Sequence, residues 1–304
     1  MTTERNPGVG SHACAAPVLD GTEVIHVDCV SHVYPDGSIG IHDMCFKVKA
    51  DEIVALCGPN GSGKSTLIEH LNGLLFPSQG RVVFHGAAVE RPVGSDLWRE
   101  VGVVFQRSDD QLFAPTVLDD VMFGPLNMGL SPEEARREAL AALHDVGAAD
   151  LAQKMPHYLS AGQKRLVAIA GVFAMHPKVI ALDEPTSDLD PLHAETIERL
   201  IRELRSVHHI SIVISTHDLD FAARIADRVC IVKSGSIIAE GPPAEIFYDR
   251  DLLQEAALKQ PLLVQLYEEF CRVSGIRTEG KPLSIQEVTR EVRSQITQKP
   301  PGND

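Results

Sequence analysis

The stretch GPNGSGKS, residues 58–65, decides the fold of this chain. It matches the pattern G-x-x-x-x-G-K-[ST], in which the backbone N–H groups of a glycine-rich loop cradle phosphate groups. The apolar run before it, residues 53–57, predicts a buried strand, and residues 65–73 predict a helix that ends at a glycine. A strand, such a loop and a helix N-terminus together direct N–H groups and a positive dipole end at an anion. The sequence therefore predicts a site for a nucleoside triphosphate.

Two side chains of this stretch predict contacts with the phosphates and with a metal ion. Lys64 supplies a mobile positive charge for the β- and γ-phosphates, and the Ser65 hydroxyl can ligate Mg²⁺. The alternative is a glycine-rich turn that binds nothing, and the strand and helix around the loop argue against it. The nucleotide-binding residues predicted here are Gly58, Pro59, Asn60, Gly61, Ser62, Gly63, Lys64, Ser65 and Thr66.

The segment VIALDE, residues 179–184, predicts residues that carry the chemistry. Its apolar part predicts a buried strand that presents Asp183 and Glu184 at its C-terminal end, where open α/β sheets bind ligands. Asp183 can hold the shell of a Mg²⁺ ion, and Glu184 can polarise the attacking water as a general base. The alternative is a pair of acids that merely ends a strand.

Gln106 ends a second predicted strand, residues 101–106, and His217 follows a third, residues 210–215. The ends of these strands converge on the edge that carries Asp183 and Glu184. Gln106 suits a ligand for Mg²⁺ or for water, and His217 suits a hydrogen bond to the γ-phosphate. Taken alone, either residue is an ordinary polar residue at the end of a strand. Together with Glu184, we predict Gln106 and His217 as the catalytic residues.

The segment LSAGQKR, residues 159–165, predicts that two copies of the chain form the site. Ser160 caps a predicted helix over residues 161–175, which at 1.5 Å per residue is about 20 Å long and leads toward the strand that carries Asp183. The helix start therefore lies far from its own phosphate loop, although Ser160, Gly162 and Gln163 are built like an anion site. Both statements hold if these residues meet the γ-phosphate of a second subunit. The alternative is an ordinary helix start.

The order of predicted elements indicates an α/β fold. Buried strands over residues 179–183, 210–215 and 229–233 alternate with helices, which predicts a mostly parallel sheet with helices on its faces. We predict a flexible arm (1–22), a nucleotide-binding domain (23–244) with an inserted helical subdomain (107–177), and a C-terminal helical extension (245–304) with a disordered tail from residue 298. The amphipathic helices of the extension favour packing on their own domain over a partner-binding module.

Composition excludes several classes of function. The net charge of −14 argues against a general affinity for nucleic acid, because such affinity needs clustered Lys and Arg. No apolar run reaches the roughly 18 residues of a membrane span. The N-terminus lacks the pattern of a signal peptide. The expectation is a cytosolic protein.

These motifs, in this order, resemble the ATP-binding subunits of ABC (ATP-binding cassette) transporters over about residues 23–240. The resemblance implies a P-loop NTPase fold with a mixed sheet and an antiparallel β subdomain, and it implies ATP and Mg²⁺ as ligands. It also implies a Walker A motif (58–65), a signature (159–163), a Walker B motif (179–184), a D-loop (187–190), a Q-loop glutamine at Gln106 and a switch histidine at His217. Tyr34 matches the aromatic residue that stacks on adenine. Two residues depart from the family pattern, Ala161 in the signature and Asp188 in the D-loop.

Residues 105–131 narrow the resemblance further, to importer ATPases of the energy-coupling-factor type and particularly to cobalt and nickel uptake systems. This resemblance implies a pair of ATPases, identical or paralogous, located peripherally on the cytoplasmic face of the cell membrane. The pair would close on ATP and drive transmembrane coupling and substrate-binding subunits. The alternatives are an energy-coupling ATPase for vitamin uptake and a non-transport ABC ATPase of translation or DNA repair.

Overall fold

The computed structural model describes residues 22–89, 97–275 and 280–298. The predicted N-terminal arm therefore lies outside the described residues except for Thr22, and the predicted tail lies outside them except for Gln298. Gln298 is the last residue of the final helix rather than part of a disordered tail.

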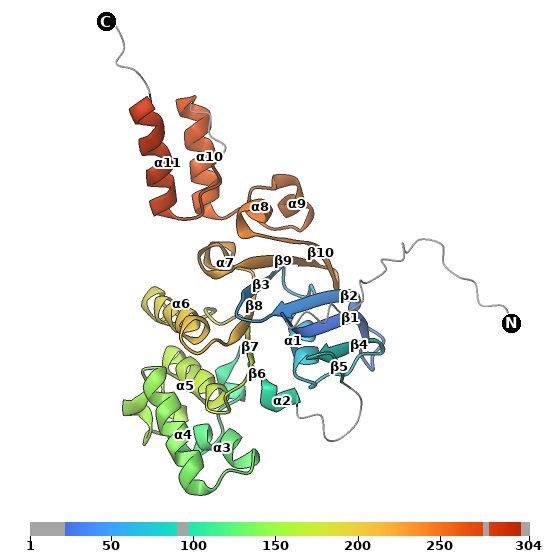
Figure 1. Ribbon diagram of the computed structural model, residues 1–304, viewed down its shortest axis with the longest axis vertical. Coiled ribbons are helices and arrows are strands. Elements are labelled where there is room, and N and C mark those ends of the chain that lie inside the picture. The colour runs from blue at the N-terminus through green and yellow to red at the C-terminus, as the bar shows by residue number, and fades with distance from the viewer. Residues whose placement is uncertain (1–21, 90–96, 276–279, 299–304) are drawn as a thin grey trace, which may run out of the picture.

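A six-stranded sheet forms the centre of the molecule (Figure 1). Its order is β10-β9-β3-β8-β7-β6, and the strands from β9 to β6 run parallel whereas β10 runs antiparallel to β9. The sheet is therefore mixed, as expected. Its strands are β3 (Ile53–Cys57), β6 (Val101–Val104), β7 (Val179–Asp183), β8 (Ser211–Thr216), β9 (Arg228–Lys233) and β10 (Ser236–Gly241).

A second, antiparallel sheet has the order β2-β1-β4-β5. Its strands are β1 (Glu23–Val33), β2 (Ile39–Lys49), β4 (Gln79–Phe84) and β5 (Ala87–Ala88). Helix α1 (Lys64–Leu71) shares a buried core with this sheet and with one face of the central sheet, in which Phe46, Leu67 and Val179 take part. The core fixes the start of α1, and with it the phosphate loop, between the two sheets.

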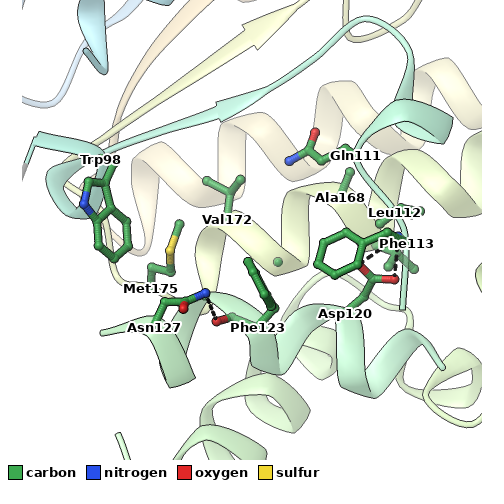
Figure 2. A pocket seen from close by; sticks show the side chains of 13 residues that line it. Trp98, Gln111, Leu112, Phe113, Asp120, Phe123, Asn127, Ala168, Val172 and Met175 are labelled. Atoms are coloured by element: carbon green, nitrogen blue, oxygen red, sulfur yellow. Dashed lines mark hydrogen bonds between the residues drawn. The ribbon is translucent and has the colours of Figure 1, made fainter. Parts of the chain in front are cut away.

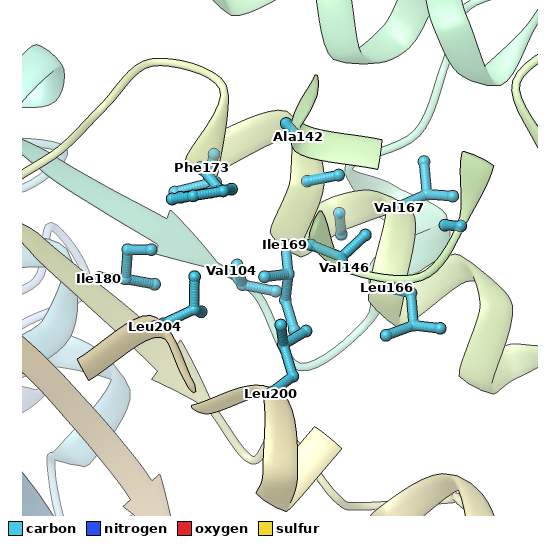
Figure 3. Packing of buried hydrophobic residues seen from close by; sticks show 14 of the residues in the cluster. Val104, Ala142, Val146, Leu166, Val167, Ile169, Phe173, Ile180, Leu200 and Leu204 are labelled. Carbon is cyan, nitrogen blue, oxygen red and sulfur yellow. The ribbon is translucent and has the colours of Figure 1, made fainter. Parts of the chain in front are cut away.

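The helical insertion covers the other face of the central sheet. Its helices are α3 (Val117–Asn127), α4 (Pro132–Asp145) and α5 (Ala161–Phe173), whereas α2 (Leu97–Glu100) precedes β6 and contributes Leu97 to the core around α1. Figure 3 shows Ile169 of α5 next to Leu200 of α6 (Pro191–Ser206), and Ile180 of β7 next to Leu204 of α6, all in one buried cluster. Alternate residues of β7 thus face different cores, since Ile180 belongs to this one and Val179 to the core around α1.

Capping boxes begin two helices of the insertion, and one of them contains Ser160, the predicted cap of α5. Ser131 accepts a hydrogen bond from the Glu134 N–H at the start of α4, and the Glu134 carboxylate accepts from the Ser131 N–H. Ser160 and Gln163 make the same reciprocal pair at the start of α5. A cap of this kind stabilises a helix by about 1 kcal/mol. The predicted helix start at Ala161 is therefore confirmed, while the helix ends at Phe173, two residues earlier than predicted.

The C-terminal part begins on the central sheet and then extends away from it (Figure 1). Its helices are α7 (Leu219–Ile225), α8 (Pro243–Phe247), α9 (Arg250–Glu255), α10 (Leu262–Ser274) and α11 (Ile285–Gln298). Phe247, Leu253 and Val264 pack against β3 and β9. The predicted boundary between residues 244 and 245 falls inside α8, and the division into domains stays a prediction.

The expectation that the terminal helices pack on their own domain is only partly correct. In α10, Val264 and Tyr267 are buried. Leu262, Leu266 and Val273 of the same helix are 63% or more exposed. The amphipathic pattern predicts the helix correctly, but the pattern does not determine what covers its apolar face.

Candidate nucleotide-binding site

The phosphate loop connects the end of β3 to the first turn of α1. Gly61 and Gly63 have φ angles of 76° and 107°, in the left-handed region that favours glycine. A Cβ on Gly63 would also lie 2.8 Å from the Gly40 carbonyl oxygen. The loop therefore needs both glycines, and its shape leaves the N–H groups at the start of α1 available for an anion.

Lys64 lies at the base of this loop with its side chain buried. Its Nζ donates hydrogen bonds to the carbonyl oxygens of Gly58 and Pro59, at 2.8 and 3.1 Å. Burial lowers the pKa of Lys64 below its ordinary value, and the charges of Glu184 and Asp183 act in the opposite direction. Loop carbonyl oxygens thus hold the ammonium group, and the charges of two nearby carboxylates favour its protonated form.

A cavity of about 370 Å³ brings most of the predicted site residues together. Gln106, Asp183 and Glu184 line it from the edge of the central sheet. The lining from the phosphate loop and α1 consists of Asn60, Gly61, Gly63, Lys64, Ser65 and Thr66. Tyr34 lines it from the antiparallel sheet, where its hydroxyl lies 2.9 Å from Thr66 Oγ1. Of the remaining loop residues, Gly58 and Pro59 hold Lys64, and Ser62 is buried within the loop.

Asp183 and Glu184 stand where β7 ends. The parallel register places Asp183 opposite Ser215 of β8, and the Ser215 hydroxyl donates a hydrogen bond to Asp183 Oδ1. The same Ser215 accepts from the Glu184 N–H through its carbonyl oxygen at 3.0 Å and through Oγ at 3.2 Å. Sequence reasoning missed Ser215, although a buried hydroxyl in the apolar run of β8 was the signal for it.

Glu184 combines a strained backbone with a defined side-chain contact. Its φ of 48° lies in the left-handed region, which costs a non-glycine residue about 1–3 kcal/mol. The Glu184 Oε1 lies 2.8 Å from Nδ1 of His217, and Glu184 as a whole is 6% exposed. Because a carboxylate only accepts, Nδ1 of His217 carries the hydrogen. His217 does not line the cavity itself but holds the carboxylate that does.

Gln106 lies two residues beyond the end of β6, so the predicted strand is longer than the observed one. Arg165 of α5 donates to the carbonyl oxygens of Phe105 and Gln106, at 2.8 and 2.6 Å. Burial lowers the pKa of Arg165, whereas Asp183, Asp188 and Glu184 raise it through their charges. Arg165 is a second residue to which the sequence assigned no role, and it ties the start of α5 to the segment that carries Gln106.

Ser160, Gly162 and Gln163 form the first turn of α5. Among the residues that the structure describes, these three are not part of the lining of the nucleotide cavity. The Ser160 hydroxyl and the Gln163 amide make the reciprocal capping bonds described above, and both residues belong to the exposed or half-buried surface. Their predicted contact with a nucleotide is therefore compatible only with a nucleotide held outside this chain's own cavity.

The donor set fits MgATP. The cavity offers an ammonium group at Lys64, hydroxyls at Ser65 and Thr66, and N–H groups at a helix start, which together suit a chain of phosphates. Mg²⁺ prefers oxygen ligands and takes only one or two carboxylates besides phosphates and water. Asp183, Ser65 and Gln106 supply such oxygens. Within the described part of the chain, no group of three or more His, Cys, Asp or Glu could hold a metal by itself.

Comparisons with known proteins agree with this geometry. The family model described as ABC transporter matches residues 41–187. The energy-coupling factor transporter ATP-binding protein EcfA of Methanosphaera stadtmanae is 43% identical over 269 residues, which is 88% of this chain and 96% of that protein. The EcfA protein of Methanocaldococcus jannaschii is 44% identical over 268 residues, covering 88% and 95% of the two chains.

Solved structures give the same result. The structure of cbiO1 from Clostridium perfringens, part of the ABC transporter complex cbiONQ, is similar with a TM-score of 0.70 and 38% identity, over 81% of this chain and 99% of that one. The dimeric ABC transporter cassette MJ0796 gives a TM-score of 0.64 and 30% identity, over 72% and 98%. Among the described residues, no helix has the length and apolar character needed to cross a bilayer.

Proposed function

This chain belongs to the family of ABC transporter ATP-binding subunits, and from this premise we propose that it drives uptake through an importer of the energy-coupling-factor type. Its family hydrolyses ATP, so the chain is an ATPase with Mg²⁺ as the associated ion. The single observation that supports a hydrolytic role for this chain is the cavity in which Lys64, Asp183 and Glu184 meet.

Binding of the nucleotide would rest on the phosphate loop and on Tyr34. The loop N–H groups and the Lys64 ammonium would hold the phosphates, and the half-buried ring of Tyr34 would stack on adenine. Ser65, Gln106 and Asp183 would hold Mg²⁺, which supplies charge neutralisation to the phosphates when bound. Ser215 would keep the Asp183 carboxylate in place through its hydroxyl.

Hydrolysis would need a base next to the phosphates, and Glu184 is the residue placed for it. Its carboxylate lines the cavity and is held at 2.8 Å by the Nδ1–H of His217. Glu184 would take the proton of the attacking water, and Gln106 would help to orient that water. His217 is exposed on its other side, and its Nε2 would donate to the γ-phosphate in the imidazolium form, in which both ring nitrogens carry hydrogen.

The catalytic unit would contain two chains. Ser160, Gly162 and Gln163 are built for an anion but do not belong to the cavity of their own chain. The dimer of the cassette MJ0796 shows that a chain of this fold forms pairs. In a two-fold pair, the first turn of α5 in each chain would reach the nucleotide of the other.

A groove on the helical insertion offers a place for the transmembrane partner. It encloses about 540 Å³ between α2, α3 and α5 (Figure 2). Phe113 and Phe123 form its rim with ring centroids 4.9 Å apart, and they are 66% and 50% exposed. Trp98 and Met175 line its other end. We propose that an amphipathic helix of a membrane-embedded subunit binds there, which would place the chain on the cytoplasmic face of the membrane. The structure of cbiO1, a part of a transporter complex, supports this proposal.

The proposed cargo is cobalt or nickel, and it rests on the similarity of residues 105–131 to the ATPases of such systems. The ion would be bound by the partners. Expression of this chain with the membrane subunits that neighbouring genes encode tests both the importer function and the cargo. Co-purification with those subunits and ATP-dependent uptake of radioactive Co²⁺ or Ni²⁺ are expected. Uptake of a vitamin instead would contradict the proposal that the cargo is a metal ion. Co-purification with ribosomes or DNA would contradict the proposal that the chain belongs to an importer.

A further inference from the structure

Gly162, in the first turn of α5, lies directly against the side chain of His193. A Cβ added to Gly162 would lie 2.3 Å from Cδ2 of His193 and 2.6 Å from its Cγ. Real Cβ atoms essentially never come so close to another atom. Gly162 is helical, so its backbone would accept alanine. The glycine is therefore required by its neighbour and not by its own conformation.

His193 is held in this position by Asp190. Nδ1 of His193 lies 2.5 Å from Asp190 Oδ2, and Asp190 Oδ1 accepts from the N–H groups of Leu192 and His193 at 3.0 Å each. Hydrogen bonds from the His193 backbone and then from its ring lower the pKa of Asp190, so the carboxylate is ionised at neutral pH. The ring is bonded to a carboxylate that two backbone N–H groups hold in place, so it has little freedom to turn away from Gly162.

The contact joins the first turn of α5, which belongs to the predicted two-chain site, to the first turn of α6. Gly162 stands in the first turn of α5 together with Ser160. His193 is in the first turn of α6. This helix begins directly after residues 187–190, which lie between it and Glu184 in the sequence. Farther along, α5 and α6 share one buried core through Ile169 and Leu200 (Figure 3). The helix bodies are thus fixed by the core, and the ring of His193 separates their starts.

We propose that His193 is a positioning residue whose ring sets the spacing between the first turn of α5 and the loop before α6. This spacing would place Ser160 and Gln163 at the correct distance for the nucleotide of the second chain. The inference deepens the proposed function and rests on it. A side chain at position 162 would displace the start of α5, and a shift of about 1 Å can cost on the order of 10²-fold in rate.

A double-mutant cycle tests the contact. Gly162→Ala is expected to lower kcat by about 10²-fold and to leave the KM for ATP within about threefold. Adding His193→Ala removes the ring atoms, and His193→Gly also removes the Cβ, which lies 3.0 Å from the added methyl. Each second substitution is expected to restore kcat, by about tenfold or more, with His193→Gly restoring at least as much as His193→Ala.

His193→Ala alone is expected to lower kcat several-fold without changing the KM for ATP, because Ser160 loses its position while the cavity of the same chain is untouched. Gly171→Ala is the matched control for the glycine substitution. It lies in the same helix, and its added Cβ would meet no atom within 4 Å. Its kcat and melting temperature are expected to stay at or above the wild-type values.

Two outcomes would overturn the inference. One is the absence of rescue, in which Gly162→Ala has the same or a lower kcat once the His193 ring is removed. The other is wild-type turnover and wild-type Tm in Gly162→Ala. If Gly162→Ala yields no folded protein, recovery of folded protein in Gly162→Ala with His193→Gly supports the inference, and continued failure overturns it. Failure of the proposed function is seen separately, as unchanged turnover in Ser160→Glu. The double-mutant cycle between positions 162 and 193 can also be measured by melting temperature, a readout that does not depend on a second chain.

Discussion

Glu184 and His217 are joined by a hydrogen bond of 2.8 Å between a carboxylate that is almost fully buried and an imidazole that is largely exposed. One end of the pair lines the nucleotide cavity, and the other faces outward from it. The pair therefore connects the proposed base to a residue that can respond to the γ-phosphate. The strained backbone of Glu184 marks the same position.

The first prediction concerns Glu184→Gln. The amide keeps the shape of the side chain but cannot take a proton, so turnover is expected to fall by about 10²- to 10⁴-fold. Binding of ATP and Mg²⁺ should persist, since the phosphate loop is unchanged. Phosphate release measures the first effect and equilibrium nucleotide binding the second. Near-normal turnover would remove Glu184 from the role of base.

The second prediction concerns Ser215→Ala. Loss of the hydroxyl frees the Asp183 carboxylate to move, so the Mg²⁺ concentration for half-maximal turnover is expected to rise by about 10- to 100-fold. A Mg²⁺ titration of the ATPase rate measures it. Ser211→Ala is the control, because Ser211 is on the same strand and only accepts from the Asp51 N–H. An equal effect of the two substitutions would show that the change is structural.

The third prediction concerns Arg165→Met. The substitution leaves two carbonyl oxygens, those of Phe105 and Gln106, without their donors. Phe105 is half-buried and Gln106 is exposed, so each lost hydrogen bond is expected to cost about 0.5–1.5 kcal/mol and the melting temperature to fall. Turnover should fall as well, because Gln106 loses its anchor. A lower melting temperature with unchanged turnover would show that Arg165 stabilises the fold but does not position Gln106 for catalysis.

The fourth prediction concerns the groove on the helical insertion. Phe123→Asp places a charge on its apolar rim and is expected to abolish co-purification with the membrane subunits. The ATPase rate of the purified chain should stay within about twofold of wild type, as for other surface substitutions. Leu140→Asp on α4 is the control, since Leu140 is exposed but does not line the groove. If Phe123→Asp still co-purifies with the membrane subunits, the partner does not bind in this groove.

The sequence predicts the fold well where a local pattern has a single physical solution. VIALD forms β7 with the predicted bounds, because an apolar run next to acids at a strand end fits only a buried strand. Ser160 caps α5 as predicted, and the structure adds Gln163 as the second member of a capping box. The edge that gathers Gln106, Asp183 and Glu184 follows from the parallel order of the strands.

The sequence does not predict contacts that depend on register or on the packing of distant helices. Ser215 is placed on Asp183 by the pairing of β7 with β8, which single-strand patterns do not contain. Gly162 and His193 lie 31 positions apart and meet only because α5 and α6 share a core. The exposed face of α10 is a third case, since an amphipathic helix does not specify its partner.

The two-chain site is the central claim, and mixing two inactive variants tests it most directly. Lys64→Ala removes the phosphate contact of one chain. Ser160→Glu puts a carboxylate where a phosphate of the other chain would lie. In an equal mixture, half of the pairs would contain one intact site, so up to about a quarter of the wild-type ATPase rate should return. A rate no higher than the average of the two variants alone would contradict the account.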